Sequence, residues 1–269
     1  MGQFHTSELN VTIKADSLIK IMPCLDMRDG RVVKGVQFVN IRDAGDPVEC
    51  AAAYCKAGAD ELAMLDITAT IENRPTMVDV VKRVSKVVTI PFSVGGGIRD
   101  TASAEVILNA GADKISISSA AFHKPHIIAE MVKAFGSDKV IAAVDAAVNA
   151  SLPSGYEVFI DGGTTGTGVD AAEWIKKIDG YGAGTVLPTS KTADGMKCGY
   201  DLQLIRMTRD MVSSGVDVIA SGGAGTLKHF KEAVDAGASI LLAASVFHFG
   251  TIDIGTLKGY LRDNGAYTP

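Results

Sequence analysis

The chain has 269 residues, of which 47% are hydrophobic and 21% charged, with 29 glycines and a formal net charge of −5. This composition is typical of a folded globular protein and excludes a disordered or fibrous one. The sequence contains no lysine and arginine cluster and no apolar run long enough to cross a membrane, so we expect binding to neither nucleic acid nor membrane. Residues 1–18 are polar and aperiodic, and we expect a cytoplasmic protein with an extension at 1–18 and one domain at 19–269.

The first predicted strand begins at Ile19, is apolar on both faces, and stops at Asp26 before a compact charged turn. Such a strand is expected in a parallel sheet covered by helices on both sides. Because chemistry in these sheets collects at the carboxyl ends of the strands, Asp26 is a catalytic candidate. This stretch alone supports equally well a carboxylate that only closes the turn behind the strand.

A strand and helix rhythm then continues along the chain. Asp46 and Pro47 are typical of a helix start, namely an N-cap followed by proline at the first helical position. The predicted later strands are 61–66, 91–94, 114–117, 140–144, 185–187, 218–220 and 240–243, and the predicted helices are 48–57, 77–87, 101–110, 125–134, 170–178, 202–214, 227–236 and 255–264. Residues 149–168 interrupt the rhythm and predict a long loop or hairpin on the active face. Eight strand and helix units favour a (β/α)8 barrel over an open sheet.

The second half of the chain repeats features of the first half. Asp26 corresponds to Asp145, the glycine run around Gly96 to that around Gly223, and 111–113 to 237–239. Two similar half-barrels in one chain explain this correspondence. We therefore expect equivalent ligand sites on opposite sides of the barrel mouth.

Each half carries a candidate phosphate site. One combines residues 95–97 with Ser119, and the other combines residues 222–223 with Ala244 and Ser245. Glycines let backbone N–H groups approach phosphate oxygens, and a serine hydroxyl adds a hydrogen bond. Two such sites predict a small-molecule substrate with a phosphate at each end.

Asp26 and Asp145 would face each other across the mouth, an arrangement suited to general acid and base catalysis. Asp66 and Asp194 follow two other strands and could orient substrate hydroxyls, although Asp194 also fits an ordinary turn. No histidine follows a strand beside a carboxylate, and there is no dinucleotide-binding glycine motif. We therefore expect neither a metal nor a cofactor.

These residues lie in strings that closely resemble one enzyme family. The strings are CLDMRDGRVVKGVQF, RDAGDPVE, DELAMLDIT, FSVGGGIRD, GADKISIS, DGMKCGYD, ASGGAG and LAASVFHF. They resemble the cyclase subunit of imidazole glycerol phosphate synthase, of histidine biosynthesis, over 19–261. The resemblance implies a (β/α)8 subunit in a heterodimer with a glutaminase, whose ammonia passes through the barrel core to the substrate. That substrate is phosphoribulosyl formimino aminoimidazole carboxamide ribonucleotide, and the products are imidazole glycerol phosphate and aminoimidazole carboxamide ribonucleotide.

The resemblance also implies residue roles, position by position. Asp26 and Asp145 would be the acid and base pair, and the substrate site would contain Lys34, Asp66, Thr189 and Asp194. The phosphates would be held by Gly97, Ser119, Gly195, Gly223, Ala244 and Ser245. Lys20, Glu61 and Lys114 would belong to a charged ring that gates ammonia at the bottom of the barrel. At the fourth ring position this chain has Thr185 where the family usually has glutamate.

Three other functions share part of this pattern. The sister isomerase of the same pathway has the half-barrel repeat, the paired aspartates and a substrate with two phosphates. A paralogous ammonia-dependent synthase could act on another phosphorylated sugar, and a barrel without activity could serve as a partner of the glutaminase. The strings GDPVE and AASVFHF favour the cyclase over the isomerase.

Overall fold

The computed structural model describes residues 18–36, 39–72, 74–266 and 268–269, with only the backbone of 34–36 and 39–42. Its helices and strands extend from Lys20 to Asp263. The extension predicted at 1–18 lies, apart from Leu18, outside the described residues. No helix in the described part of the chain is long and apolar enough to cross a membrane.

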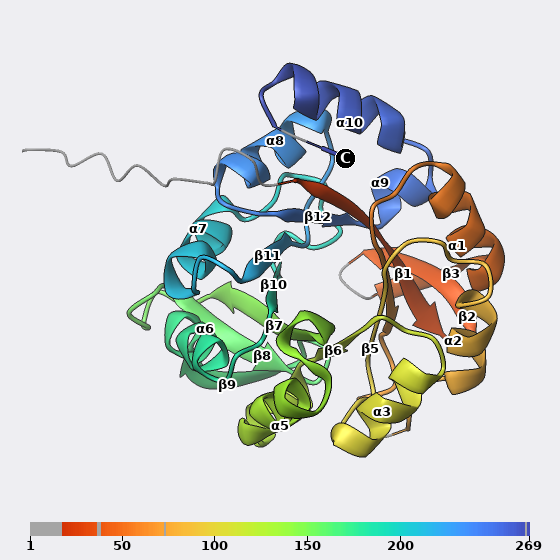
Figure 1. Cartoon of the computed structure of the whole chain (residues 1–269). Coiled ribbons are helices and arrows are strands. Elements are labelled where there is room, and N and C mark those ends of the chain that lie inside the picture. Colours follow the sequence, from red (N-terminus) through yellow and green to blue (C-terminus); the bar gives the residue numbers. More distant parts are fainter. Residues whose placement is uncertain (1–17, 37–38, 73, 267) are drawn as a thin grey trace, which may run out of the picture.

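Eight parallel strands form a closed ring, which Figure 1 shows with helices around it. In ring order they are β10 (Thr185–Ser190), β11 (Asp217–Ala220), β12 (Ile240–Ala243), β1 (Lys20–Arg28), β4 (Leu62–Asp66), β5 (Phe92–Gly95), β6 (Lys114–Ile117) and β7 (Val140–Val148). The pairing of β10 with β7, in register from Thr185 opposite Ile141 to Ser190 opposite Ala146, closes the ring. The predicted (β/α)8 barrel is confirmed.

One helix follows each barrel strand and precedes the next. These helices are α1 (Pro47–Lys56), α2 (Val78–Val84), α3 (Thr101–Asn109), α5 (His126–Phe135), α6 (Ala171–Gly180), α7 (Leu202–Met211), α8 (Leu227–Asp235) and α10 (Ile254–Asp263). The predicted start of α1 is confirmed, because the Asp46 carboxylate accepts a hydrogen bond from Val48 N at 2.8 Å ahead of Pro47. The short helices α4 (Ser119–His123) and α9 (Ser245–His248) and the 3₁₀ turn η1 (Ser137–Lys139) were not predicted.

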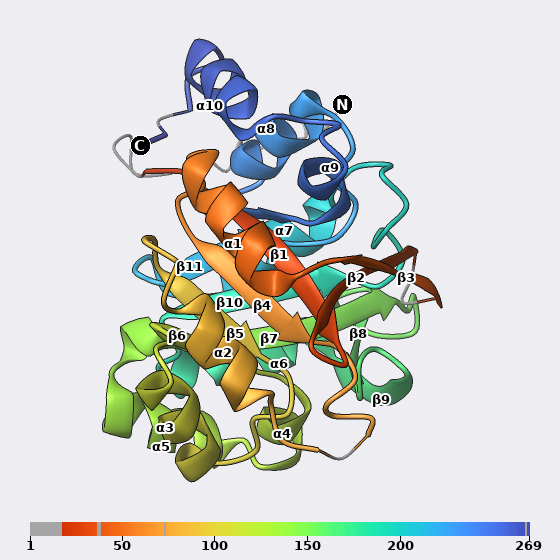
Figure 2. The same ribbon diagram turned by 90° about the vertical axis from the view of Figure 1, so that its right-hand side faces the viewer.

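Two hairpins extend the barrel beyond the carboxyl ends of its strands. β2 (Arg31–Val36) pairs with the end of β1 and with β3 (Val39–Gly45). β8 (Tyr156–Ile160) pairs with the end of β7 and with β9 (Thr165–Asp170), which confirms the hairpin predicted at 149–168. Figure 2 shows the two hairpins on the same side of the molecule.

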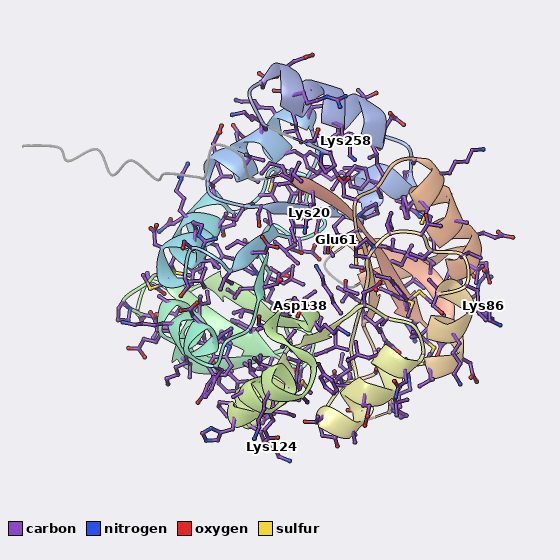
Figure 3. All side chains as sticks on the ribbon, in the orientation of Figure 1. Lys20, Glu61, Lys86, Lys124, Asp138 and Lys258 are labelled. Carbon is purple, nitrogen blue, oxygen red and sulfur yellow. The ribbon has the colours of Figure 1, made fainter. Side chains whose placement is uncertain are left out.

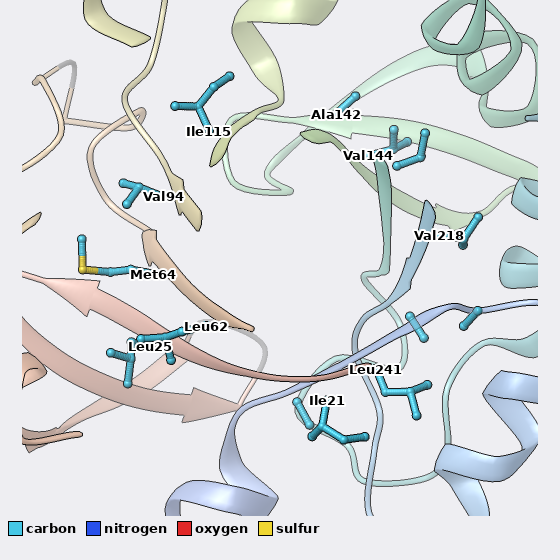
Figure 4. Packing of buried hydrophobic residues seen from close by; sticks show 14 of the residues in the cluster. Ile21, Leu25, Leu62, Met64, Val94, Ile115, Ala142, Val144, Val218 and Leu241 are labelled. Carbon is cyan, nitrogen blue, oxygen red and sulfur yellow. The ribbon is translucent and has the colours of Figure 1, made fainter. Parts of the chain in front are cut away.

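The hydrophobic core has two layers. The large layer lies between the strands and the helices, and Figure 4 shows part of it around Leu25, Met64 and Val144. The small layer fills the inside of the barrel and consists of Met22, Cys24, Ala63, Ile141, Leu187, Ile219, Ile240 and Leu242. Burial on both faces explains why these strands are apolar throughout.

Alternation along each strand places polar groups at both ends of the inner layer. On β1 the inward series is Lys20, Met22, Cys24 and Asp26, so it begins and ends with a charge. The series on β7 passes from Ile141 through Ala143 to Asp145. The barrel therefore carries inward-facing charged residues at its bottom and carboxylates at its mouth.

Candidate active site

The mouth of the barrel contains a cavity of about 1220 Å³. Its lining includes Asp26, Asp66, Gly97, Ser119, Asp145, Thr189, Asp194, Gly195, Gly223, Ala244 and Ser245. The structure thus brings these predicted site residues around one space. Lys34 lies in β2, and its side chain is outside the described part of the structure. Within the described residues, no three histidine, cysteine, aspartate or glutamate side chains are grouped to hold a metal ion.

Asp26 and Asp145 lie opposite each other across this cavity. β1 and β7 are four strands apart in either direction around the eight-strand ring, which is the largest separation that the ring allows. Both residues continue the inward series of their strands, and both are half-buried at the cavity wall. The Cys24 thiol donates a hydrogen bond to Asp26 Oδ1 at 3.3 Å. A ligand in the cavity would lie between two carboxyl groups.

The electrostatic surroundings of Asp145 change its acidity. The pKa of the Asp145 carboxyl is raised to about 6, mainly by desolvation and further by the negative charge of Asp194. The Lys191 ammonium acts in the opposite direction and lowers the pKa. A carboxylate with a raised pKa is a stronger base than an ordinary aspartate and is still mostly ionised at neutral pH.

Asp66 also lines the cavity, but its carboxylate is bound by protein. On β4 it is out of phase with the inward residues Ala63 and Leu65, so its side chain meets the loop that follows the strand. There Arg74 donates from Nη1 to Oδ2 at 2.6 Å and from Nη2 to Oδ1 at 2.8 Å. The hydrogen bonds to Asp66 raise the pKa of Arg74 against the effect of burial, and the hydrogen bond to Glu72 and the charges of both carboxylates raise it further. Asp66 therefore organises the β4–α2 loop, which forms part of the cavity wall.

The first glycine turn follows β5 and packs tightly on the β4–α2 loop. Gly96 and Gly97 have φ angles of 90° and 75°, which side chains rarely adopt. A Cβ on Gly96 would come 2.1 Å from the backbone oxygen of Asp66. The Thr76 hydroxyl donates a hydrogen bond to the Gly96 carbonyl and fixes the turn.

The second glycine turn follows β11 and repeats this arrangement in the other half. Gly222 and Gly223 have φ angles of 83° and 105°. A Cβ on Gly223 would come 2.0 Å from the backbone oxygen of Gly199, in the loop after β10. The Gly199 N–H donates to the Gly223 carbonyl at 2.8 Å. Both turns are thus held by the loop that follows the preceding strand, as expected for a repeated half-barrel.

The two candidate phosphate serines begin the short helices. Ser119 is the first residue of α4 after β6, and Ser245 is the first residue of α9 after β12. The Ser119 hydroxyl accepts a hydrogen bond from Asp161 N at 2.9 Å, so the tip of the β8–β9 hairpin rests on it. Its own proton remains available to an anionic ligand. A phosphate site built from barrel loops and the start of a short helix is common in this fold.

The end of β10 contributes Thr189 to the site, and the loop that follows contributes Asp194 and Gly195. Thr189 is in register with Asp145 on β7, so their side chains lie on the same face of the sheet. Asp194 N donates to Ser190 O at 2.9 Å, and Gly195 has a φ angle of 74°. The loop is anchored from outside by Asp201, which accepts hydrogen bonds from Tyr156 and Ser190 at 2.7 and 3.1 Å.

A charged ring closes the opposite end of the barrel. Glu61 is only 2% exposed and binds Lys20 Nζ at 2.7 Å and Lys114 Nζ at 2.8 Å. Figure 3 looks onto this end, with Lys20 and Glu61 over the middle of the ring. Lys20, Lys114 and Thr185 also line a second cavity of about 440 Å³. Although burial works to lower it, the pKa of Lys20 is raised overall by its hydrogen bond to Glu61 and by nearby carboxylates.

Three residues that line this site or contact its residues had no predicted role. Arg74 lies in a loop without periodicity, so no sequence pattern could have paired it with Asp66. Lys191 is two residues after Thr189, and strand alternation could have indicated that it faces the same cavity. Phe159 lies beside Asp145 across the β7–β8 pair, which only the hairpin register reveals.

Comparison with known proteins shows which protein family this chain resembles. The family model described as histidine biosynthesis protein matches residues 20–253. The imidazole glycerol phosphate synthase subunit HisF of Thermobifida fusca is 51% identical over 250 residues, 92% of this chain and 97% of that protein. The protein of the same name from Salinispora tropica is 49% identical over 249 residues, again 92% of this chain and 97% of its own length.

Proposed function

This chain belongs to the histidine biosynthesis protein family, and we propose that it acts as the cyclase subunit of an imidazole glycerol phosphate synthase. In this role it uses ammonia to convert phosphoribulosyl formimino aminoimidazole carboxamide ribonucleotide to imidazole glycerol phosphate and aminoimidazole carboxamide ribonucleotide. The ammonia comes from a glutaminase subunit, the partner in a heterodimer. A biosynthetic function of this kind belongs in the cytoplasm, as we expect from the sequence.

One observation carries the proposal: two opposed aspartates share a cavity with two equivalent glycine turns. Asp26 and Asp145 are four strands apart around the ring. The turns at Gly97 and Gly223 each lie beside a serine that begins a short helix. A substrate with a phosphate at each end can bind both turns at once, and its middle then lies between the carboxyl groups.

The chemistry requires proton transfers around this middle region. Addition of ammonia, cleavage and ring closure each move protons, and two carboxyl groups on opposite sides can donate and accept them. With a pKa raised to about 6, Asp145 is a stronger base than an ordinary aspartate and is mostly ionised at neutral pH. Asp26 then acts from the other side. These transfers need no redox step, which agrees with the expectation that no cofactor takes part.

The proposed ammonia route enters through the charged ring. Glu61, held by Lys20 and Lys114, lies at the bottom of the barrel, and the inner layer above it contains small side chains such as Ala63 and Cys24. Thr185 adds a short, uncharged side chain at the wall of the lower cavity. We assign Lys20, Glu61 and Lys114 to the gate through which ammonia from the glutaminase passes.

One assay tests the function directly. The purified chain receives the ribulosyl substrate and ammonium salt at alkaline pH, where more of the salt is free ammonia, and consumption of the substrate is followed. We expect both products to form at equal rates. A parallel assay supplies the phosphoribosyl precursor without ammonia, and consumption of that precursor would instead identify the sister isomerase. If neither substrate is consumed, the remaining functions are a paralogous synthase and a partner without activity.

A further inference from the structure

Lys191 is fixed next to Asp145 by the barrel itself. Its backbone N–H donates to Ala146 O at 2.9 Å, which extends the β7–β10 ladder by one residue beyond Ser190. On β10 the inward series passes from Leu187 to Thr189, and Lys191 continues it into the same cavity. The position of this lysine relative to Asp145 is therefore set by strand register and not by a mobile loop.

The Lys191 side chain is held by an aromatic ring that is also the neighbour of Asp145. Its Nζ lies 4.0 Å from the centre of the Phe159 ring, within the range of a cation–π contact. Phe159 is directly opposite Asp145 in the antiparallel β7–β8 pair, so the two side chains share one face. The lysine stem runs beside Gly163 of the hairpin, where an added Cβ would come 3.8 Å from Cδ.

Asp145 lies near charges of both signs, and Lys191 is the positive one. Asp194, three residues after Lys191 in the chain, is a like charge that opposes ionisation of Asp145. Lys191 is the opposite charge that favours ionisation, and it also acts on Glu157, two residues before Phe159 on β8. The residues in register with Asp145 on β8 and β10, Phe159 and Thr189, are uncharged.

We propose that Lys191 is a positioning residue of the active site, whose ammonium, held over Phe159, keeps the Asp145 carboxylate ionised against Asp194. The inference rests on the proposed function, in which Asp145 accepts a proton. Lys191 forms no bond to the reacting atoms in this account. It acts through Asp145, and the hairpin supplies the ring that holds it in place.

The test compares charge and shape at this position. Lys191→Met removes the ammonium and keeps the apolar stem, Lys191→Arg keeps the cation, and Phe159→Leu removes the ring but keeps an apolar side chain. Lys197→Met is the matched control, because Lys197 is another lysine that lines the same cavity but lies outside the β7–β10 ladder that places Lys191 beside Asp145. The Asp145 carboxyl is titrated by carbon NMR in each folded variant, with Asp145→Asn assigning its signal.

Removal of a nearby opposite charge raises the pKa of a carboxyl. We expect Lys191→Met to raise that of Asp145 by about half a unit to one unit, Phe159→Leu to raise it less, and Lys191→Arg and Lys197→Met to leave it unchanged. At constant free ammonia, the acidic limb of kcat/KM should move to higher pH in Lys191→Met. The loss of kcat/KM should be about two- to six-fold near pH 6 and vanish at alkaline pH.

The outcomes separate this inference from the proposed function. An unchanged Asp145 titration in Lys191→Met would overturn the inference about Lys191. A loss of activity that is equal at every pH would also overturn it, because such a loss indicates a structural role. If Asp145 titrates in Phe159→Leu as it does in the unaltered chain, the Phe159 ring does not hold Lys191 in place for this role. If the unaltered chain showed no ammonia-dependent turnover, the proposed function would fail, and the titration would still decide the role of Lys191.

Discussion

Arg74 binds the Asp66 carboxylate with both terminal nitrogens, at 2.6 and 2.8 Å. The Asp66 side chain is 2% exposed, so the guanidinium satisfies a charge that water scarcely reaches. The same Arg74 donates to the Thr68 hydroxyl at 2.8 Å, and its backbone oxygen lies against Gly97. This ion pair shapes the loop on which the first glycine turn rests.

We predict that Arg74→Ala weakens substrate binding more than it slows the chemical step. Loss of the guanidinium leaves the Asp66 carboxylate buried without its partner and loosens the support of the Gly96–Gly97 turn. The free energy of unfolding should fall by about 1–3 kcal/mol, and KM should rise about tenfold with a smaller change in kcat. Urea unfolding and steady-state kinetics with ammonium salt measure the two effects.

Glu72→Gln provides the control for this variant. Glu72 accepts from Arg74 Nε at 2.7 Å but is 41% exposed, so its loss should change neither stability nor KM appreciably. A fall in kcat at constant KM in Arg74→Ala would contradict a role in supporting the phosphate turn.

We predict that Asp26→Asn and Asp145→Asn each remove most turnover. The amide keeps the shape of the carboxyl but cannot exchange the proton in the same way, and kcat should fall on the order of 100-fold or more. Folding and substrate affinity should be nearly unchanged, as checked by thermal unfolding and by binding of the substrate without ammonia. Turnover close to that of the unaltered chain in either variant would reject that residue as a catalytic group.

The fold could be predicted from the sequence because each strand is buried on both faces. Apolar runs that end in a carboxylate, a glycine or a serine marked seven of the eight barrel strands, and Asp46 with Pro47 marked the start of α1. Helix ends were less accurate: α7 ends at Met211, where the pattern had predicted Ser214. The short helices α4 and α9 escaped prediction because four or five residues carry no helical period.

Site residues could be predicted from the sequence only where they lie at the ends of strands or in the turns that follow. The strand ends placed Asp26 and Asp145 in the series that faces inward, and the repeat placed Gly97 and Gly223 in equivalent turns. The bond between Asp66 and Arg74 depends on loop geometry, which has no period in the sequence. For the same reason the contact of Lys191 with Phe159 required the register of the β7–β8 hairpin.

We predict an anion at both glycine turns. Crystals grown in sulfate or phosphate should show one ion at the backbone of Gly97 with Ser119, and another at Gly223 with Ser245, because two equivalent turns face one cavity. Gly223→Ala should empty the second site, since its Cβ would collide with Gly199 O. N–H groups that point away from the cavity, or both turns empty at high anion concentration, would count against the phosphate assignment.

The last prediction concerns the route of ammonia. Ammonia from solution can reach the mouth of the barrel directly, whereas the proposed route takes ammonia from a glutaminase at the opposite face through the ring that contains Glu61. Lys114 holds Glu61 there through contacts of 3.0 and 2.8 Å and does not line the upper cavity. Lys114→Ala should therefore impair glutamine-dependent turnover in the complex much more than turnover with ammonium salt.

The ratio of the two rates isolates the passage, because both assays share the chemistry at Asp26 and Asp145. Lys139→Ala is the matched control: Lys139 is an exposed lysine that lines the same lower cavity but does not bind Glu61, so its ratio should stay that of the unaltered complex. Equal losses in both assays for Lys114→Ala would mean that the lysine acts through stability or the substrate site. If Lys114→Ala leaves the ratio of the two rates at that of the unaltered complex, Lys114 is not part of the gate. The reason is that removal of a cation that binds the buried Glu61 must alter the entrance if ammonia enters there.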